Sequence, residues 1–139
     1  MREKIRIRRK IFHNLLSEAT YGMRNGGERE VCGYLYGRDG LYLDYRMVGN
    51  VAKRDDEFEI GIIDQLKSIF YRMGERYRDE IIFHTHFKSK KLSTKDVFGL
   101  PKGRIYCVIF KHDLFFYRLE QDGSAVRIVK LDYELAGVK

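Results

Sequence analysis

Hydrophobic residues recur at two different spacings along the chain, and these spacings predict where strands and helices form. Ile5 and Ile7 alternate with arginines, which indicates a short strand. Over about residues 10–24 the hydrophobic residues recur every three or four positions instead, which predicts an amphipathic helix. The Asn-Gly-Gly stretch at 25–27 favours an end to this helix, because Asn and Gly tolerate a left-handed backbone.

A hairpin and a second helix are expected next. Residues 30–37 are mostly apolar and predict a strand, and Asp39-Gly40 favours a tight turn that returns the chain along residues 41–49. Residues 62–78 carry hydrophobic side chains at helical spacing, which predicts the second helix. Alternation in the returning strand predicts one face made of Leu41, Leu43, Tyr45 and Met47.

The remaining hydrophobic runs predict further strands. Residues 80–83 read as a buried strand, and three more are expected at about 104–111, 113–120 and 125–131. Two main helices and about seven strands in mixed order indicate an α+β fold with a mixed sheet flanked by helices. The length of 139 residues suits one domain, so residues 1–139 are expected to form a single unit.

Composition narrows the class of protein further. A hydrophobic content of 44% is enough for a packed core without disulfides. The two cysteines, Cys32 and Cys107, lie in apolar runs and are expected to be buried as small hydrophobic residues. No apolar run approaches ~20 residues, and the charged N-terminus lacks the features of a secretory signal. We therefore expect a cytoplasmic protein without a membrane partner.

The net charge of +7 favours acidic partners, among which nucleic acid is one class. However, the basic residues are scattered and 20 acidic residues are mixed among them. The chain also lacks helix-turn-helix, zinc-finger and RNP-like motifs. This pattern favours a solvated, charge-rich surface over a nucleic-acid-binding one.

The candidate chemistry lies at the end of the apolar strand 80–83. His84 and His86 are two residues apart on an extended chain, so both imidazoles point to one face and can bind the same metal. Asp96 is a natural third ligand, and Ser93 can donate a hydrogen bond to an oxyanion. Taken singly, the histidines suit a structural role, Asp96 a helix-dipole contact and Ser93 an N-cap; their combination favours a site.

These residues resemble the JAMM motif of the JAB1/MPN/JAMM family, in which His-x-His is followed by Ser-x-x-Asp. The segment from Glu30 to Gly37 is similar to the Glu-x-x-Gly-x-Leu-x-Gly stretch of the same family. Asn50 and Phe58 also resemble the family's segment after its third strand. The resemblance covers about residues 1–131. It departs from the family pattern at Phe87, where the family usually has Pro, and in a shorter loop before Ser93.

The resemblance implies a fold, an activity and a role for each residue. The fold would be an MPN-type domain, with a curved mixed sheet of the cytidine-deaminase-like kind. His84, His86 and Asp96 would bind zinc, Glu30 would activate a water molecule, and Ser93 would stabilise the oxyanion; Glu28 is the alternative to Glu30. The reaction would be hydrolysis of a peptide or isopeptide bond at the C-terminus of a ubiquitin-like or sulfur-carrier protein.

Two other functions stay open at this stage. Some relatives are metal-free MPN-like scaffolds that act through protein interaction, and RadC-like relatives are associated with DNA. A homodimer is compatible with exposed strand edges. Lys88, Lys90 and Lys91 either form a solvated loop or steer an acidic substrate towards the site. His13 and His112 are expected to be structural or exposed rather than ligands.

Overall fold

The computed structural model describes residues 4–25, 30–52, 58–73, 77–86, 90–92, 96–97 and 100–137. The mixed α+β character expected from the sequence is confirmed. Neither helix in this part of the chain is long and apolar enough to cross a membrane. The elements are β1 (Ile5–Arg8), α1 (Arg9–Asn25), β2 (Cys32–Arg38), β3 (Leu41–Val48), α2 (Ile62–Met73), β4 (Asp79–Thr85), β5 (Ile105–Phe110), β6 (Asp113–Asp122), β7 (Ala125–Leu131) and β8 (Tyr133–Ala136).

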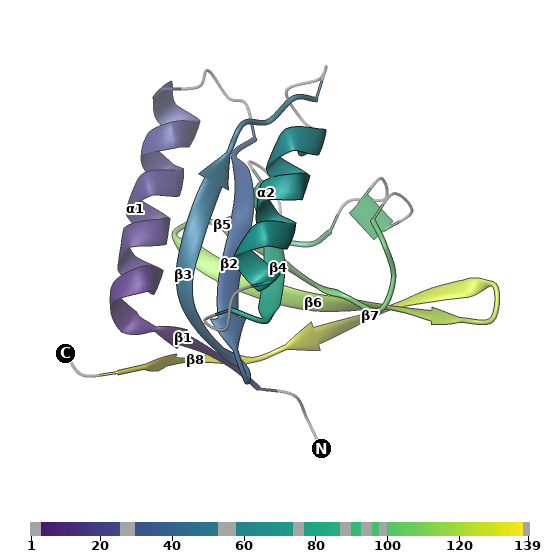
Figure 1. Ribbon diagram of the computed structural model, residues 1–139. Coiled ribbons are helices and arrows are strands. Elements are labelled where there is room, and N and C mark those ends of the chain that lie inside the picture. Colours follow the sequence, from purple (N-terminus) through teal and green to yellow (C-terminus); the bar gives the residue numbers. More distant parts are fainter. Residues whose placement is uncertain are drawn as a thin grey trace.

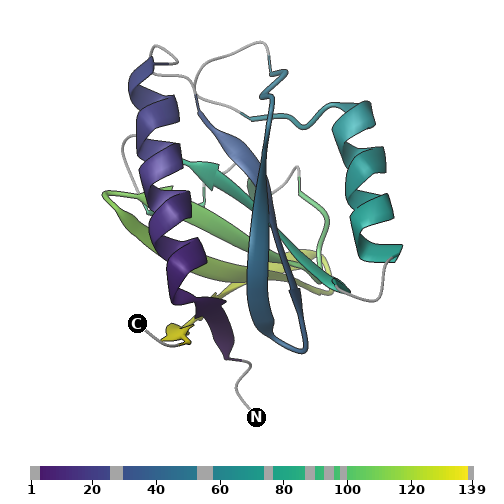
Figure 2. The same ribbon diagram turned by 60° about the vertical axis from the view of Figure 1, so that its left-hand side comes forward.

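One curled sheet of eight strands organises the molecule, in the order β7-β6-β5-β4-β2-β3-β1-β8 (Figure 1). β1 pairs in parallel with β3 and β8, β4 pairs in parallel with β5, and the other neighbours are antiparallel. Figure 2 shows α1 and α2 on opposite sides of the strands β2, β3 and β4. The centre of the sheet is therefore covered twice, once by each helix.

The side of the sheet that faces α1 carries the main hydrophobic core. Leu15 and Ala19 of α1 are fully buried there, and they belong to the same core as Ile81 and Phe83 of β4. The packing is close enough to require a glycine on β2. A Cβ atom on Gly33 would lie 2.4 Å from the Phe83 ring and 2.3 Å from the Arg46 carbonyl oxygen.

The side that faces α2 is more polar. The Tyr36 hydroxyl donates a hydrogen bond to Ser68 Oγ at 3.0 Å, and Arg46 pairs with Asp64 at 2.9 Å. These contacts turn the polar face of α2 towards the sheet. Its large hydrophobic side chains are exposed instead, namely Ile62, Ile63, Leu66, Ile69 and Phe70.

The second helix is shorter than the hydrophobic spacing predicts. The sequence pattern extends the helix to residue 78, but α2 ends at Met73, and residues 77 and 78 lie outside it. Gly74 follows Met73 in the sequence, and glycine is the residue that most often ends a helix. The sequence also misses β8, a strand of only four residues, which forms because it pairs with β1.

The predicted single face of β3 is also wrong in detail. Tyr45 and Met47 pack against the main core, but Leu43 packs against the cluster on the α2 side. The cause is an irregularity between Tyr36 and Gly37 of β2, across which the pairing skips Leu43. An extra residue in one strand reverses the side to which the following residues point.

Candidate metal site

The end of β4 and the segment before β2 bring the candidate residues together. Cys32 pairs with His84 in the antiparallel ladder, and the Thr85 amide donates a hydrogen bond to the Val31 carbonyl oxygen at 2.9 Å, which extends the pairing beyond β2. The Val31 amide also donates to Thr85 Oγ1 at 2.8 Å. Continued by one residue, this register places Glu30 opposite His86.

Three ligand atoms converge at this point. His84 Nε2 lies 2.8 Å from His86 Nε2 and 3.1 Å from Asp96 Oδ2, and His86 Nε2 lies 3.3 Å from the same oxygen. Ligands at zinc distances of 2.0–2.1 Å in a tetrahedron lie about 3.3 Å apart. The three atoms are therefore spaced nearly as a tetrahedral ion requires, and a small outward movement would complete the fit.

Burial prepares His84 for metal binding. The side chain is fully buried, and this burial lowers the pKa of His84 although Asp96 opposes the shift. The imidazole is thereby kept neutral, which is the form that binds a metal. Phe58 stacks on its ring at a centroid distance of 4.2 Å. Among the described residues, Nδ1 of His84 has no hydrogen-bond partner, so the ring is held by this stacking and by the contacts of its Nε2 atom.

Glu30 lies beside the two histidines. Its side chain is buried, and a carboxylate oxygen lies within 4.8 Å of the ligand atoms of both histidines. Asp96 Oδ2 lies 3.1 and 3.3 Å from the two Nε2 atoms. Both carboxylates therefore lie where they could accompany the two imidazoles around a metal ion. The residues Glu30, His84 and His86 thus form a potential metal-binding group.

Asn50 holds the backbone around Glu30. Its side-chain amide donates to the Glu30 carbonyl oxygen at 2.9 Å. Its Oδ1 atom accepts hydrogen bonds from the backbone amides of Ala52 and Glu59, both at 3.0 Å. One side chain therefore connects Glu30 to the segment that presents Phe58 to His84.

Of the residues expected from the sequence, the structure brings together Glu30, His84, His86 and Asp96. Ser93 lies outside the described residues. The other sequence expectations outside them are Glu28, Phe87 and Lys88. Both cysteines are buried, as predicted. His13 and His112 are exposed, and His112 contacts Thr20.

Sequence reasoning missed the roles of Asn50, Phe58 and Thr85. Asn50 and Phe58 entered only through the family resemblance, and their contacts with Glu30 and His84 cross 20 and 26 positions of the chain. Thr85 lies between the two histidines, where alternation predicts only that it points away from them. No local pattern signals its hydrogen bond to Val31 across the two strands.

Comparison with known proteins gives a fold relationship only. No family model matches the chain, and no curated protein matches it. The structure is similar to the solution structure of protein DSY2949 from Desulfitobacterium hafniense, with a TM-score of 0.71 over 95% of this chain and 92% of that chain. The two sequences are 18% identical, so the likeness shows a shared fold and nothing about activity.

Proposed function

We propose that this chain is an MPN-type, cytidine-deaminase-like domain that hydrolyses an amide bond with the help of a zinc ion. The observation that carries the proposal is the convergence of His84, His86 and Asp96, with ligand atoms 2.8 to 3.3 Å apart, beside the buried Glu30. Two imidazoles, one carboxylate and a further position for water are typical of catalytic zinc sites.

Each residue of the site would have its own role in the reaction. A bound zinc would supply Lewis-acid chemistry, polarising the carbonyl oxygen and lowering the pKa of water. Glu30 would accept the proton of the attacking water and pass it to the nitrogen of the leaving amine. Ser93 keeps the role that the family resemblance implies, donation of a hydrogen bond to the oxyanion. Asn50 would keep Glu30 in place through its bond to the Glu30 backbone.

The substrate that we propose is the C-terminal tail of a ubiquitin-like or sulfur-carrier protein, joined by a peptide or isopeptide bond. This part rests on the JAMM-like sequence pattern. The complete set of ligands favours an enzyme over a metal-free scaffold, because a scaffold has no need for two buried histidines aimed at one carboxylate. A homodimer and a cytoplasmic location remain part of the proposal.

Metal content tests the proposal most directly. The purified wild-type protein should contain about one zinc per chain by elemental analysis. His86→Ala and Asp96→Ala should lose the metal and keep the fold seen by circular dichroism. His13→Ala is the matched control, since His13 is exposed and should leave the zinc content unchanged.

Measurements of cleavage distinguish the proposed general base from the proposed zinc ligands. Glu30→Gln should retain zinc but lose cleavage of a ubiquitin-like fusion by about 10²- to 10⁴-fold, the usual contribution of a general base. A wild-type protein that takes up no zinc, even after reconstitution, would remove the hydrolase proposal. Loss of zinc in Glu30→Gln would instead make Glu30 a ligand.

A further inference from the structure

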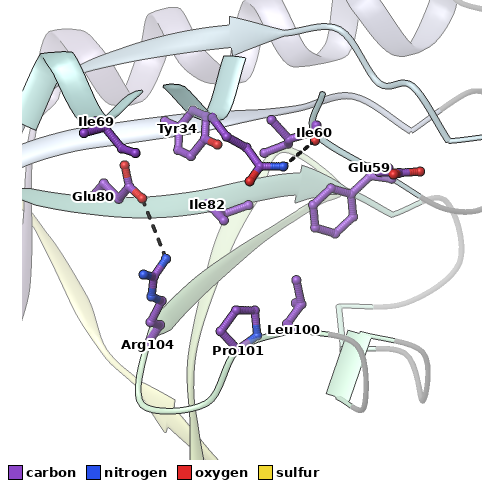
Figure 3. Close-up of a pocket in the computed structure, with 11 residues that line it drawn as sticks. Tyr34, Glu59, Ile60, Ile69, Glu80, Ile82, Leu100, Pro101 and Arg104 are labelled. Carbon is purple, nitrogen blue, oxygen red and sulfur yellow. Dashed lines mark hydrogen bonds and ion pairs between the residues drawn. The ribbon is translucent and has the colours of Figure 1, made fainter. Parts of the chain in front are cut away.

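A pocket of about 420 Å³ opens next to the candidate metal site. Figure 3 shows Ile69 and Tyr34 on the upper side of the pocket and Leu100 and Pro101 on the lower side. Its apolar walls come from Ile69 of α2, Ile82 of β4, Leu100 and Pro101. This volume and this lining are typical of sites that bind a small molecule or a side chain.

The pocket and the metal group share walls. Phe58 lines the pocket and also stacks on His84. Ile82 lines the pocket from the same face of β4 as His84, two residues away. Leu100 lines it from below, and its amide donates to the Asp96 carbonyl oxygen at 3.0 Å. A chain that lies across the metal group can therefore extend directly into the pocket.

Among the described residues that line the pocket, acidic side chains outnumber basic ones. Two carboxylates, those of Glu59 and Glu80, and one guanidinium, that of Arg104, line it. The Glu80 side chain is only 10% exposed and accepts a hydrogen bond from Ser68 Oγ. Arg104 is 53% exposed and reaches Glu80 at 3.9 Å, a contact at the outer limit for an ion pair (Figure 3). Of this pair, the acidic side chain is the buried one and the basic side chain is half exposed to solvent.

The charge of Glu80 acts on its surroundings within the pocket. Burial raises the pKa of Tyr34 to about 12, and the Glu80 carboxylate adds to the shift. The Tyr34 hydroxyl is protonated at neutral pH, as a tyrosine with the ordinary pKa of 10 also is. A neutral phenol, apolar walls and a buried carboxylate together fit a long side chain with an aliphatic stem and a cationic end.

We infer that this pocket is a specificity site for a basic residue, arginine or lysine, in the substrate chain, with Glu80 as the group that recognises its charge. The inference rests on the proposed hydrolase function, because the metal group fixes where the scissile amide lies. The stem of the basic residue packs between Ile69, Ile82 and Pro101. Its head group replaces or joins Arg104 at Glu80.

Strand geometry limits the position of that basic residue. Glu80 and His84 lie four residues apart on β4, which corresponds to about 13 Å. An extended substrate covers this distance with about four residues. Because an arginine side chain is itself long, fewer residues are needed between the scissile amide and the basic residue. The basic residue therefore lies two to four positions from the scissile amide.

The test compares arginine with citrulline, a neutral residue of nearly the same shape. Seven-residue acetylated alanine-rich peptides carry one or the other at each position in turn. Binding is followed by amide chemical shifts of the metal-free wild-type protein, which cannot cut them, and cleavage is followed with the zinc-loaded protein. We expect arginine to bind about tenfold more tightly than citrulline at one or two adjacent positions, as a charge-assisted hydrogen bond allows.

Variants of the two glutamates show which carboxylate causes the preference for arginine over citrulline. Glu80→Gln should bring arginine and citrulline within about twofold of each other, whereas Glu59→Gln, which alters an exposed carboxylate on the same pocket, should preserve most of the difference. The inference is overturned if wild-type protein binds the two peptide series equally, or prefers a glutamate series. If arginine is preferred but no peptide or fusion is cut, the pocket stands and the proposed hydrolase function fails.

Discussion

The two sides of the sheet are built on opposite principles. On the α1 side, Leu15 and Ala19 are completely buried against the core. On the α2 side, the helix turns Ser68 and Asp64 to the sheet and leaves Ile63 and Phe70 exposed, at 63% and 71%. The first helix is held by apolar burial, the second by hydrogen bonds and ion pairs. We therefore expect truncations of α1 to cost more stability than truncations of α2, and the candidate metal site lies on the α2 side.

The same division runs along a single strand. Ile81 and Phe83 of β4 point into the α1-side core, while Glu80, Ile82 and His84 alternate with them and point to the other side. A substitution on this strand should therefore affect stability or function according to whether its position number is odd or even. The four predictions below test the comparison between the two sides of the sheet, from the largest expected effect to the smallest.

Matched truncations in the two helices test the comparison most strongly. Leu15→Ala should lower the free energy of unfolding by about 2 to 5 kcal/mol, because it leaves a cavity in a closed core. Ile63→Ala should change it by less than about 0.5 kcal/mol, because the side chain is already 63% exposed. Urea denaturation of both variants measures the difference. A loss in Ile63→Ala equal to that in Leu15→Ala would show that another surface covers α2 in solution.

Removal of the metal should also affect stability, although less than the loss of the core. A ligand that binds only the folded state stabilises it by about 3 kcal/mol at a free concentration 100-fold above its Kd. Adding a chelator to zinc-loaded wild-type protein should therefore lower the melting temperature, and Asp96→Ala should show no such shift. A chelator effect of the same size in Asp96→Ala would place the metal elsewhere.

Much of the α1 side follows from the sequence, and much of the α2 side does not. Alternation and helical spacing depend on neighbouring residues, so they predict α1 and the hairpin and, on the α2 side, the convergence of His84 and His86. They cannot tell which face of α2 meets the sheet, because that depends on Arg46 reaching Asp64 from another element. In the same way Asn50 and Phe58 acquire their roles through contacts made by the folded chain.

A buried tyrosine on the α2 side gives a smaller effect with a defined pH dependence. Burial raises the pKa of Tyr106 to about 12, with Arg104 opposing the shift and Glu80 adding to it, and its hydroxyl donates to the Pro101 carbonyl oxygen at 2.6 Å. The folded-state pKa is raised above the ordinary value of 10. The contribution of the neutral Tyr106 hydroxyl to the free energy of unfolding is therefore complete below pH 10 and declines as the pH rises towards 12.

Tyr106→Phe should therefore cost about 1 kcal/mol at neutral pH, the usual value of one hydrogen bond, and should weaken the loss of stability above pH 10. Denaturant titrations at pH 8 and at pH 11 measure both changes. Tyr21→Phe is the control, because Tyr21 is 70% exposed on α1. An unchanged alkaline slope in Tyr106→Phe would assign the loss of stability to other tyrosines.

The smallest effect concerns two lysines that follow β4 in the sequence. Lys90 and Lys91 are exposed, and they follow the end of β4 closely in the sequence. If they steer an acidic substrate, replacing both with glutamate should slow kcat/KM for an acidic fusion protein a few-fold at low salt, with little change above about 0.3 M salt, where charges are screened. Lys10→Glu, an exposed charge on α1, should leave the rate almost unchanged. Equal rates for the lysine variant and wild type at low salt would make these residues an ordinary solvated loop, and the α2 side would then select its substrate through the pocket alone.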